Sequence, residues 1–427
     1  MRRPALKLLS TLLVAALPST SVAAGFSIFE AGARALGMGG ALVAQADDPS
    51  AIFFNPAGIT QLDRTNVYLG VSLIFAGTKF AGVDPSPGFG VEDETKTMLF
   101  TPINAYITHT IRPGLAVGIG VFNPYGLGQD WENASTFSGR HIANEVDLKT
   151  FNINPTVAWS PSRYFSVGAG LQLLYAQVKL HQFIQRWDPN GSGLLDVGTL
   201  ELTGDNGLDF GFNIGVRVVP DERFVIGATF RNQVTAEVDD GEADFTQVSS
   251  GNAALDAAVA AQFPADQQAR TKVKLPWLAS IAGAYTGLER WVFEVDFNIT
   301  GWEEFEQLAF SFEDPTLDTV RPQDYETKLS IRSGAGYDLT EDIQVRGGYY
   351  YDPTPQPEKA MSPLLADQDR HGITAGLGYA RSSWTVDVFG LYIFTDERDN
   401  EGTSLDNFDG TYATFANLVG INIGYRF

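Results

Sequence analysis

The chain ends on the stretch Ile421-Asn422-Ile423-Gly424-Tyr425-Arg426-Phe427, in which apolar or aromatic side chains occupy every odd position. Small or polar residues fill the even positions, and this repeat of two is typical of a β-strand with one apolar face. No polar tail follows Phe427 to cover that face. A transmembrane barrel turns such a face toward lipid and the other toward its lumen, so the stretch predicts a barrel strand.

The beginning of the chain predicts export. Arg2, Arg3 and Lys7 are followed by the short apolar run 8–17 and by the small residues of Ser21-Val22-Ala23. A basic start, a short apolar core and small residues before a cut are typical of a secretory signal peptide. We therefore assign residues 1–23 to a signal peptide that is removed after Ala23 or Ala24; a buried N-terminal helix is the alternative.

Composition narrows the class of protein. Of 427 residues, 29 are basic and 51 acidic, so without the three basic residues of the signal the net charge is −25. Such a surface argues against nucleic acid as a partner. The absence of cysteine suits an oxidising compartment. No apolar run after the signal reaches the roughly 18 residues of a membrane helix, and no linker divides the chain, so we expect one domain.

Segments with a two-residue repeat recur along the whole chain. Phe293, Val295, Phe297 and Ile299, for example, alternate with Glu294 and other polar residues. Counting all such segments gives fourteen strands, an even number that returns both termini to the same side, as in bacterial outer-membrane barrels. They begin near residues 65, 96, 114, 148, 164, 208, 223, 273, 290, 325, 342, 370, 384 and 413.

The connections between these segments fall into two classes. Tight turns such as Arg112-Pro113-Gly114 and Gly287-Leu288-Glu289-Arg290 alternate with long polar stretches such as 125–147, 184–207 and 239–271. Short turns on one rim and long loops on the other are typical of the periplasmic and extracellular ends of a barrel. A two-layer β-sandwich is the alternative, but it rarely sorts its loops by length. We expect an all-β, 14-stranded antiparallel transmembrane β-barrel at 63–427.

Two segments differ from a plain barrel. Residues 24–62 precede the first strand and are rich in small residues, and we expect them to enter the lumen as a hatch, or plug. An alanine-rich stretch at 252–263 lies in a long external loop. Leu255, Val259 and Phe263 recur at every fourth position there, which predicts a helix with one apolar stripe.

Several short motifs, in order along the chain, resemble the FadL-type transporters of long-chain fatty acids and other hydrophobic compounds. The resemblance covers essentially the whole mature chain. Each motif alone is weak, and their order makes the resemblance strong. The motifs are Ala24-Gly25-Phe26, Asp47-Asp48-Pro49-Ser50, Asn55-Pro56-Ala57, Asn123-Pro124-Tyr125-Gly126-Leu127, Leu275-Pro276-Trp277, Thr300-Gly301-Trp302, Asp352-Pro353-Thr354-Pro355 and Asp367-Gln368-Asp369-Arg370.

This resemblance implies a route for a hydrophobic ligand in the outer membrane of a Gram-negative bacterium. The ligand first meets an apolar groove of low affinity between external loops, to which the resemblance assigns Leu255, Val259 and Phe263. It then enters a tighter pocket in the barrel. It leaves sideways through a gap in the third strand when the hatch rearranges. The alternative for the three apolar residues is a loop helix that packs on a neighbouring loop.

The ligand pocket is where the sequence departs from the resemblance. The family's best-known fatty-acid binder has an arginine late in the fifth strand, and the corresponding residue here is Gln182. A lysine of the tenth strand has its nearest counterpart two positions on, at Lys328. The carboxylate-binding residues are therefore not all present, and aromatic hydrocarbons, which some relatives carry, become an alternative substrate.

Alternation also predicts which charged side chains face the lumen. The set comprises Arg217, Arg231, Lys274, Lys328, Arg332, Arg346, Glu294, Asp296 and Asp387. Most of these charges should pair with one another to hold the hatch. Lys328 and Arg332 are the candidates to bind a carboxylate head group. With the resemblance, we assign Phe26, Gln182, Lys328 and Arg332 to the lumenal pocket.

The third strand contains the predicted exit. Pro124 cannot donate a ladder hydrogen bond, so Asn123-Pro124 should interrupt the strand. We expect a local gap in the wall there, lined by hatch residues near Asn55, Pro56 and Ala57. The alternative is that Pro124 ends the strand at the outer rim.

The sequence offers no candidate enzyme site. The four histidines, at positions 109, 141, 181 and 371, are scattered and have no metal-ligand spacing, so we expect neither metal nor cofactor. A general porin and a barrel enzyme such as a lipase are the alternative classes; the hatch argues against the first, and the second lacks a nucleophile cluster. The expected partners are a long-chain fatty acid or other hydrophobic small molecule, outer-membrane lipid and lipopolysaccharide, with the protein a monomer.

Overall fold

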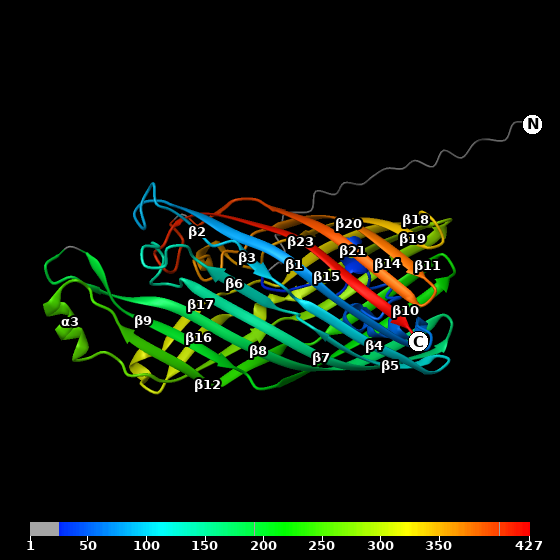
Figure 1. Ribbon diagram of the computed structural model, residues 1–427, viewed down its shortest axis with the longest axis horizontal. Coiled ribbons are helices and arrows are strands. Elements are labelled where there is room, and N and C mark those ends of the chain that lie inside the picture. The colour runs from blue at the N-terminus through cyan, green and yellow to red at the C-terminus, as the bar shows by residue number, and fades with distance from the viewer. Residues whose placement is uncertain (1–24, 192, 401) are drawn as a thin grey trace, which may run out of the picture.

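The computed structural model describes residues 25–191, 193–400 and 402–427, so the predicted signal peptide at 1–23 lies outside it. Fourteen antiparallel strands form a closed barrel, as predicted (Figure 1). The barrel strands are β1 (Thr65–Gly82), β4 (Ile103–Arg112), β5 (Leu115–Phe122), β7 (Glu145–Ser162), β8 (Phe165–Trp187), β10 (Asp209–Asp221), β11 (Phe224–Arg231), β14 (Trp277–Leu288), β15 (Trp291–Gly301), β18 (Lys328–Asp338), β19 (Ile343–Asp352), β20 (Arg370–Arg381), β21 (Trp384–Thr395) and β23 (Gly410–Arg426).

The C-terminal strand closes this barrel. β23 pairs with β21 on one side and with β1 on the other, from Asn66↔Arg426 to Gly82↔Gly410. Phe427 donates its backbone N–H to Thr65 O at 2.9 Å, so the last residue completes the seam. Asn422 is buried inside the barrel, whereas Ile423 and Phe427 are exposed on the outer wall. The alternation in the last seven residues therefore separates lumen from lipid, as predicted.

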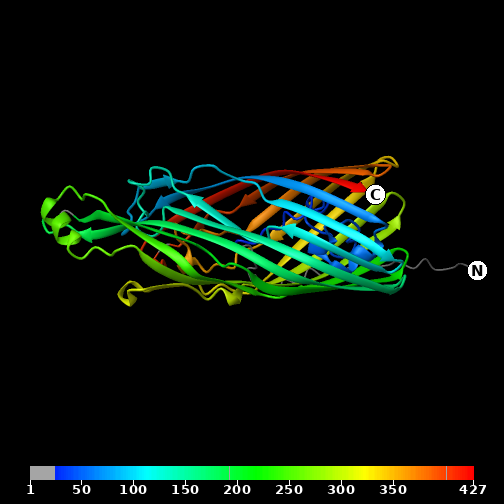
Figure 2. The same ribbon diagram turned by 60° about the horizontal axis from the view of Figure 1, so that its bottom comes forward.

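Short turns join the strands at the end of the barrel that holds the C-terminus, and long connections extend from the other end (Figure 2). No helix among the described residues is long and apolar enough to cross a membrane. The long connections contain β2 (Glu92–Glu94), β3 (Met98–Phe100), β6 (Gly126–Asp130), β9 (Leu194–Asp205), β12 (Val234–Gln247), α3 (Ala253–Ala260), β13 (Gln267–Leu275), η2 (Trp302–Glu304), β16 (Gln307–Phe312), η3 (Pro315–Leu317), β17 (Thr319–Pro322), η4 (Glu358–Ala360) and β22 (Arg398–Asp399).

The strands turn an apolar face outward and a polar face inward. In β15, Phe293 and Phe297 are 38% and 42% exposed, whereas Glu294 and Asp296 are 1% and 0% exposed. This arrangement suits a barrel that meets lipid outside and polar groups inside. Lys274 is an exception to the predicted inward set: it is exposed on β13, while its neighbours Val273 and Leu275 are buried. The prediction was wrong there because the segment breaks at Pro276 between β13 and β14, so one alternation does not run through both.

Residues 25–62 lie among the inward-facing side chains of the barrel strands. The segment contains α1 (Ala33–Gly37), α2 (Ala51–Phe54) and η1 (Pro56–Gln61), and almost all of its apolar side chains are buried. α1 contacts β19, β20, β21 and β23, while η1 contacts β5, β7, β8 and β10 on another part of the wall. The segment is drawn in dark blue within the barrel in Figure 2.

Two carboxylates of β15 hold the middle of this segment by its backbone. Asp296 accepts hydrogen bonds from the N–H groups of Leu42 and Val43, at 3.0 and 3.1 Å. Glu294 accepts from the N–H groups of Ala44 and Gln45 and from the Gln45 side chain, at 2.6, 3.1 and 2.6 Å. We refer to this set of five hydrogen bonds as the amide clamp. The sequence predicted that both carboxylates face the inside of the barrel. It did not predict that they accept hydrogen bonds from the backbone N–H groups of residues 42–45.

Polar side chains from other strands also bind the segment. Asn422 accepts from Ala33 N at 2.8 Å, Tyr106 donates to Ala31 O at 2.7 Å, and Arg217 donates to Ala44 O at 3.1 Å. Within the predicted inward set, Arg346 pairs with Asp387. The prediction that most of the set pair with one another was wrong, because Arg332 pairs with Asp352 and the carboxylates of β15 bind backbone amides instead.

Candidate functional site

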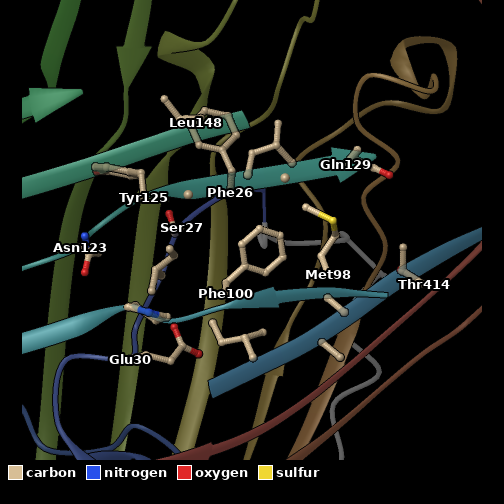
Figure 3. A pocket seen from close by; sticks show the side chains of 18 of the residues that line it. Phe26, Ser27, Glu30, Met98, Phe100, Asn123, Tyr125, Gln129, Leu148 and Thr414 are labelled. Carbon is tan, nitrogen blue, oxygen red and sulfur yellow. The ribbon is translucent and has the colours of Figure 1, made fainter. Parts of the chain in front are cut away.

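A cavity of about 550 Å³ lies where the barrel wall is interrupted. We call it the lateral cavity. Its lining comes from the N-terminal segment, from β1, β3 and β4 on one side, and from β6 and β7 on the other. Residues of β21, β23 and the stretch 365–370 complete it. Figure 3 shows Phe26 and Ser27 between Phe100 of β3 and Tyr125, which directly precedes β6. The lining includes both the buried Leu418 and the exposed Leu99, so the cavity reaches from the inside of the wall to its outer surface.

The interruption follows from Asn123-Pro124, as the sequence predicted. β5 ends at Phe122 after pairing with both β4 and β7, and β6 begins at Gly126 and pairs with β7 alone among the strands. Among the strands that the structure describes, β3 pairs with β1 alone, so no ladder joins β3 to β6. The Asn123 side chain replaces part of the missing ladder, since it accepts from Ile103 N at 2.9 Å and donates to Thr150 O at 2.6 Å. The break therefore opens the wall and does not simply end a strand at the rim.

The N-terminal segment fills the unpaired edge. Ile28 N donates to Pro124 O at 2.8 Å, and Gly126 N donates to Phe26 O at 3.0 Å. Ser27 and Tyr125 thereby form an antiparallel bridge. Unpaired backbone N–H and C=O groups away from water cost free energy. These two hydrogen bonds therefore hold residues 26–28 against the unpaired edge, where a neighbouring strand would otherwise lie.

This finding corrects the predicted position of the Asn55-Pro56-Ala57 motif. The backbone at Pro56 packs against Gly168 of β8, and the Asn55 side chain lies against Gly215 of β10. Asn55 also donates to Val216 O at 3.0 Å. None of the three motif residues lines the lateral cavity, and residues 26–28 occupy the gap instead. The sequence could not place the motif because the path of a segment within a lumen depends on contacts with many strands.

Phe26 lies between the lateral cavity and a second cavity of about 80 Å³, which we call the inner cavity. The Phe26 ring packs edge-on against Trp302 and Phe305, with ring centroids 4.7 and 5.3 Å apart. The inner cavity is almost entirely apolar and includes Leu148, Leu180, Leu202, Phe305 and Phe310. Phe26 thus separates the inner cavity from the lateral cavity, which reaches the outer surface of the wall.

Trp302 and Phe305 were not among the residues predicted for the site. Trp302 is fully buried, and its indole meets both Phe26 and Tyr325. The available signal was the Thr300-Gly301-Trp302 motif: Gly301 lets the Trp277 indole approach, since a side chain at 301 would meet that ring at 1.9 Å.

A pair of charges anchors the start of the described chain beside the lateral cavity. Gly25 N donates to an Asp367 oxygen at 2.7 Å, and Arg370 donates to Gly25 O at 2.8 Å and to Asp367 at 2.7 Å. Glu30 also lines the cavity, on the segment that carries Phe26 (Figure 3). Charged groups of the cavity therefore lie beside the N-terminal segment, at Glu30, Asp367 and Arg370, and a second pair, Lys149 and Asp147, lies on β7.

The structure does not bring the predicted head-group residues together. Gln182 lies in β8, beyond both cavities, opposite Leu200 of β9. Arg332 is buried under the N-terminal segment, where it binds Asp352 at 2.9 Å and covers the Phe29 ring at 4.0 Å. Lys328 lines a separate polar cavity and pairs with Glu326 at 2.9 Å. Of the four predicted pocket residues, Phe26 is the one that lines the apolar cavities.

The predicted external helix is present, as α3, at the far tip of the long connections (Figure 1). Asn252 caps it by accepting from Ala254 N and Leu255 N, at 3.1 and 3.2 Å. Hydrogen bonds from Ser250 lower the pKa of Asp256 in its first turn. Leu255 is buried and Val259 is half-buried. Phe263 lies beyond the end of α3, not on the helix as predicted, and its ring packs over Gly198 of β9. The apolar stripe thus contacts the hairpin of β8 and β9 through Phe263.

Residues 14–427 match the model of a family described as outer membrane protein transport protein (OMPP1/FadL/TodX). The long-chain fatty acid transport protein of Escherichia coli strain K12 is 26% identical over 443 residues, which cover 97% of each chain.

Two solved structures show the same fold. A Pseudomonas aeruginosa FadL homologue is 18% identical and has a TM-score of 0.83, with 95% of this chain and 100% of that chain covered. The Pseudomonas putida toluene transporter TodX is 16% identical and has a TM-score of 0.72, with 96% and 99% covered.

Proposed function

Because this chain belongs to the family of outer membrane transport proteins described as OMPP1/FadL/TodX, we propose that it is a channel through which hydrophobic molecules cross the outer membrane. Its place in that membrane follows from the family and from the barrel. The matched relatives are transport proteins, and we infer that this chain likewise performs no catalysis. One closed barrel needs no strand from a second copy, so we further infer that it acts as a monomer.

The lateral cavity is the observation that carries the proposed route. An apolar molecule inside the barrel cannot leave through a continuous ladder of strands, whereas the break at Asn123-Pro124 offers an apolar opening to the outer wall. The volume of about 550 Å³ falls within the range of roughly 300–1,000 Å³ found for small-molecule sites. We propose that a hydrophobic molecule passes from the inner cavity, past Phe26, to the lateral cavity and then into the bilayer.

Residues 25–62 would act as the hatch on this route. Their two hydrogen bonds across the gap are few, and the amide clamp holds the segment elsewhere. Release of residues 26–28 from Pro124 and Gly126 would therefore open the gap without unfolding the barrel. The external stripe on α3 is proposed as the site of first contact.

Two substrate classes are supported by different observations. The name of the Escherichia coli relative favours long-chain fatty acids. The lining favours neutral compounds such as aromatic hydrocarbons: among the described residues that line the lateral cavity, Arg370 and Lys149 are the cations, and each lies beside a carboxylate, Asp367 or Asp147. A carboxylate head group would have to displace one of these partners.

A reversible cross-link across the gap tests the proposed exit. Cysteines at Phe100 of β3 and Gly128 of β6 can be joined by a cleavable bis-maleimide, because the chain has no cysteine of its own. Joining them should stop the uptake of a hydrophobic compound by cells that lack their own transporter, and cleavage should restore it. The control joins Val295 and Ser333, which already face each other on paired strands. Undiminished uptake in the cross-linked protein would exclude this exit.

A further inference from the structure

The short-turn end of the barrel carries four exposed arginines on one side. Arg426 ends β23, Arg64 precedes β1, Arg112 ends β4, and Arg163 lies in the turn between β7 and β8. These positions are neighbours around the rim: Phe427 N binds Thr65 O, Thr110 N binds Arg64 O, and Ser160 N binds Gly114 O. We call the four residues the basic arc.

Among the described residues, the basic arc has no carboxylate partner. Within the described part of the chain, none of its guanidinium groups lies within 4.0 Å of an acidic oxygen. Arg163 instead lies over the Tyr164 ring, at 4.7 Å from its centroid, and Arg426 reaches Ser382 O at 3.5 Å. Because an unpaired guanidinium keeps its donors available, the arc presents a positive surface to whatever lies beside it.

The other side of the same rim is rich in exposed acidic residues. The turn between β10 and β11 carries Asp221 and Glu222, and Arg223 there already pairs with Asp221 at 3.6 Å. The turns between β14 and β15 and between β18 and β19 add exposed acidic residues, Glu289, Glu341 and Asp342. Arginines also stand on this side, but Arg223 and Arg381 pair with Asp221 and Asp342 at 3.6 and 3.9 Å, and Arg290 follows Glu289. The excess of arginine over carboxylate is therefore on the side of the basic arc.

Aromatic side chains place the basic arc at the depth of lipid head groups. Trp159, Tyr164 and Trp384 are about half exposed on the outer wall, within a few residues of the short turns. Tryptophan and tyrosine are enriched where the hydrocarbon of a bilayer meets its head groups. Both chain ends of a bacterial barrel, and its short turns, lie on the periplasmic side, so this belt marks the inner leaflet.

We propose that the basic arc binds the phosphate head groups of anionic phospholipids in the inner leaflet of the outer membrane. A guanidinium matches a phosphate with two parallel donors, and the arc repeats this group across adjacent strands. The arc lies below β1, β4, β5 and β7, the strands next to the lateral cavity. Bound lipid would hold the bilayer against the wall on the side where it opens. The proposal does not depend on which compound the channel carries.

Native mass spectrometry of the purified full chain tests this. The protein is offered equal amounts of phosphatidylglycerol and phosphatidylethanolamine in detergent, and the retained lipids are counted. We expect wild type to prefer phosphatidylglycerol, and each arginine replaced by glutamine to lower that preference by up to about fivefold. The test variant carries R64Q, R112Q, R163Q and R426Q. The matched control carries R223Q and R290Q, on the acidic side.

Heat-dependent mobility on gels verifies that each variant is a folded barrel. If the fourfold variant does not fold, R112Q and R163Q are measured singly, and each must still lose part of the preference. An unchanged preference in the folded variants would overturn the proposal and leave the arc to an acidic protein partner. A loss in the R223Q/R290Q control that is equal per arginine removed would overturn it as well, because the effect would then reflect net charge alone.

Discussion

Removing the amide clamp should open the barrel to ions. In the variant Glu294→Ala/Asp296→Ala, the N–H groups of residues 42–45 lose all five of their hydrogen bonds to β15. At about 1 kcal/mol for each bond, the five bonds contribute on the order of 5 kcal/mol to docking of the segment. Even half of that value would raise the population of the undocked segment about 70-fold.

Planar lipid bilayers measure the result directly, because an undocked segment leaves a water-filled lumen. We expect the variant to show frequent conductance steps, while wild type stays mostly closed. Glu289→Ala is the control, since Glu289 precedes β15 and is exposed at the rim. If conductance does not change in the folded double variant, the segment does not close the passage, and the proposed role of residues 25–62 as a hatch is refuted.

Three further outcomes are expected from uptake assays in cells that lack their own transporter. Gly128→Leu should lower uptake strongly, because even a Cβ at 128 would lie 2.4 Å from the Phe100 ring. Gly390→Leu is the control, since a Cβ at 390 would have no atom within 4 Å, and equal uptake by both variants would contradict a passage at β6. Lys328→Ala should change uptake of fatty acid and of neutral hydrocarbon by less than about twofold, because its ion pair with Glu326 lies outside both apolar cavities; a loss confined to fatty acid would instead establish Lys328 as the head-group contact. Phe26→Ala should join the two cavities, weaken docking of its segment by roughly 3–5 kcal/mol and speed uptake of neutral compounds; slower uptake would show that the ring guides the ligand.

The break in the third strand shows how far the sequence reaches. Proline removes a ladder donor wherever it stands, so Asn123-Pro124 predicted the interruption of the wall from local chemistry alone. What fills the interruption was not predictable in this way. Residues 26–28 bind Pro124 and Gly126 from nearly a hundred positions away along the chain, and the expected Asn55-Pro56-Ala57 lies instead beneath β8 and β10.

For the charged residues, the sequence predicted which side of the wall they face but not which groups they bind. Alternation placed Glu294, Asp296 and Arg332 inside the barrel, because successive side chains of a strand point to opposite faces. It failed for Lys274, where Pro276 separates β13 from β14. Alternation also gives no information on partners. That Arg332 binds Asp352 and the Phe29 ring, and that Lys328 faces a polar cavity, depends on which loops and which part of residues 25–62 fold against them.

The sequence by itself determined the barrel, its strand number, its two kinds of connection and the position of the break. Each of these depends on the two-residue repeat, on turn residues or on one proline, which act over a few positions of the chain. Only the tertiary structure decided the path of residues 25–62, the amide clamp, the two apolar cavities and the one-sided basic arc. Those features arise where residues remote in sequence meet around a closed barrel, and a local pattern carries no information about which of them will meet.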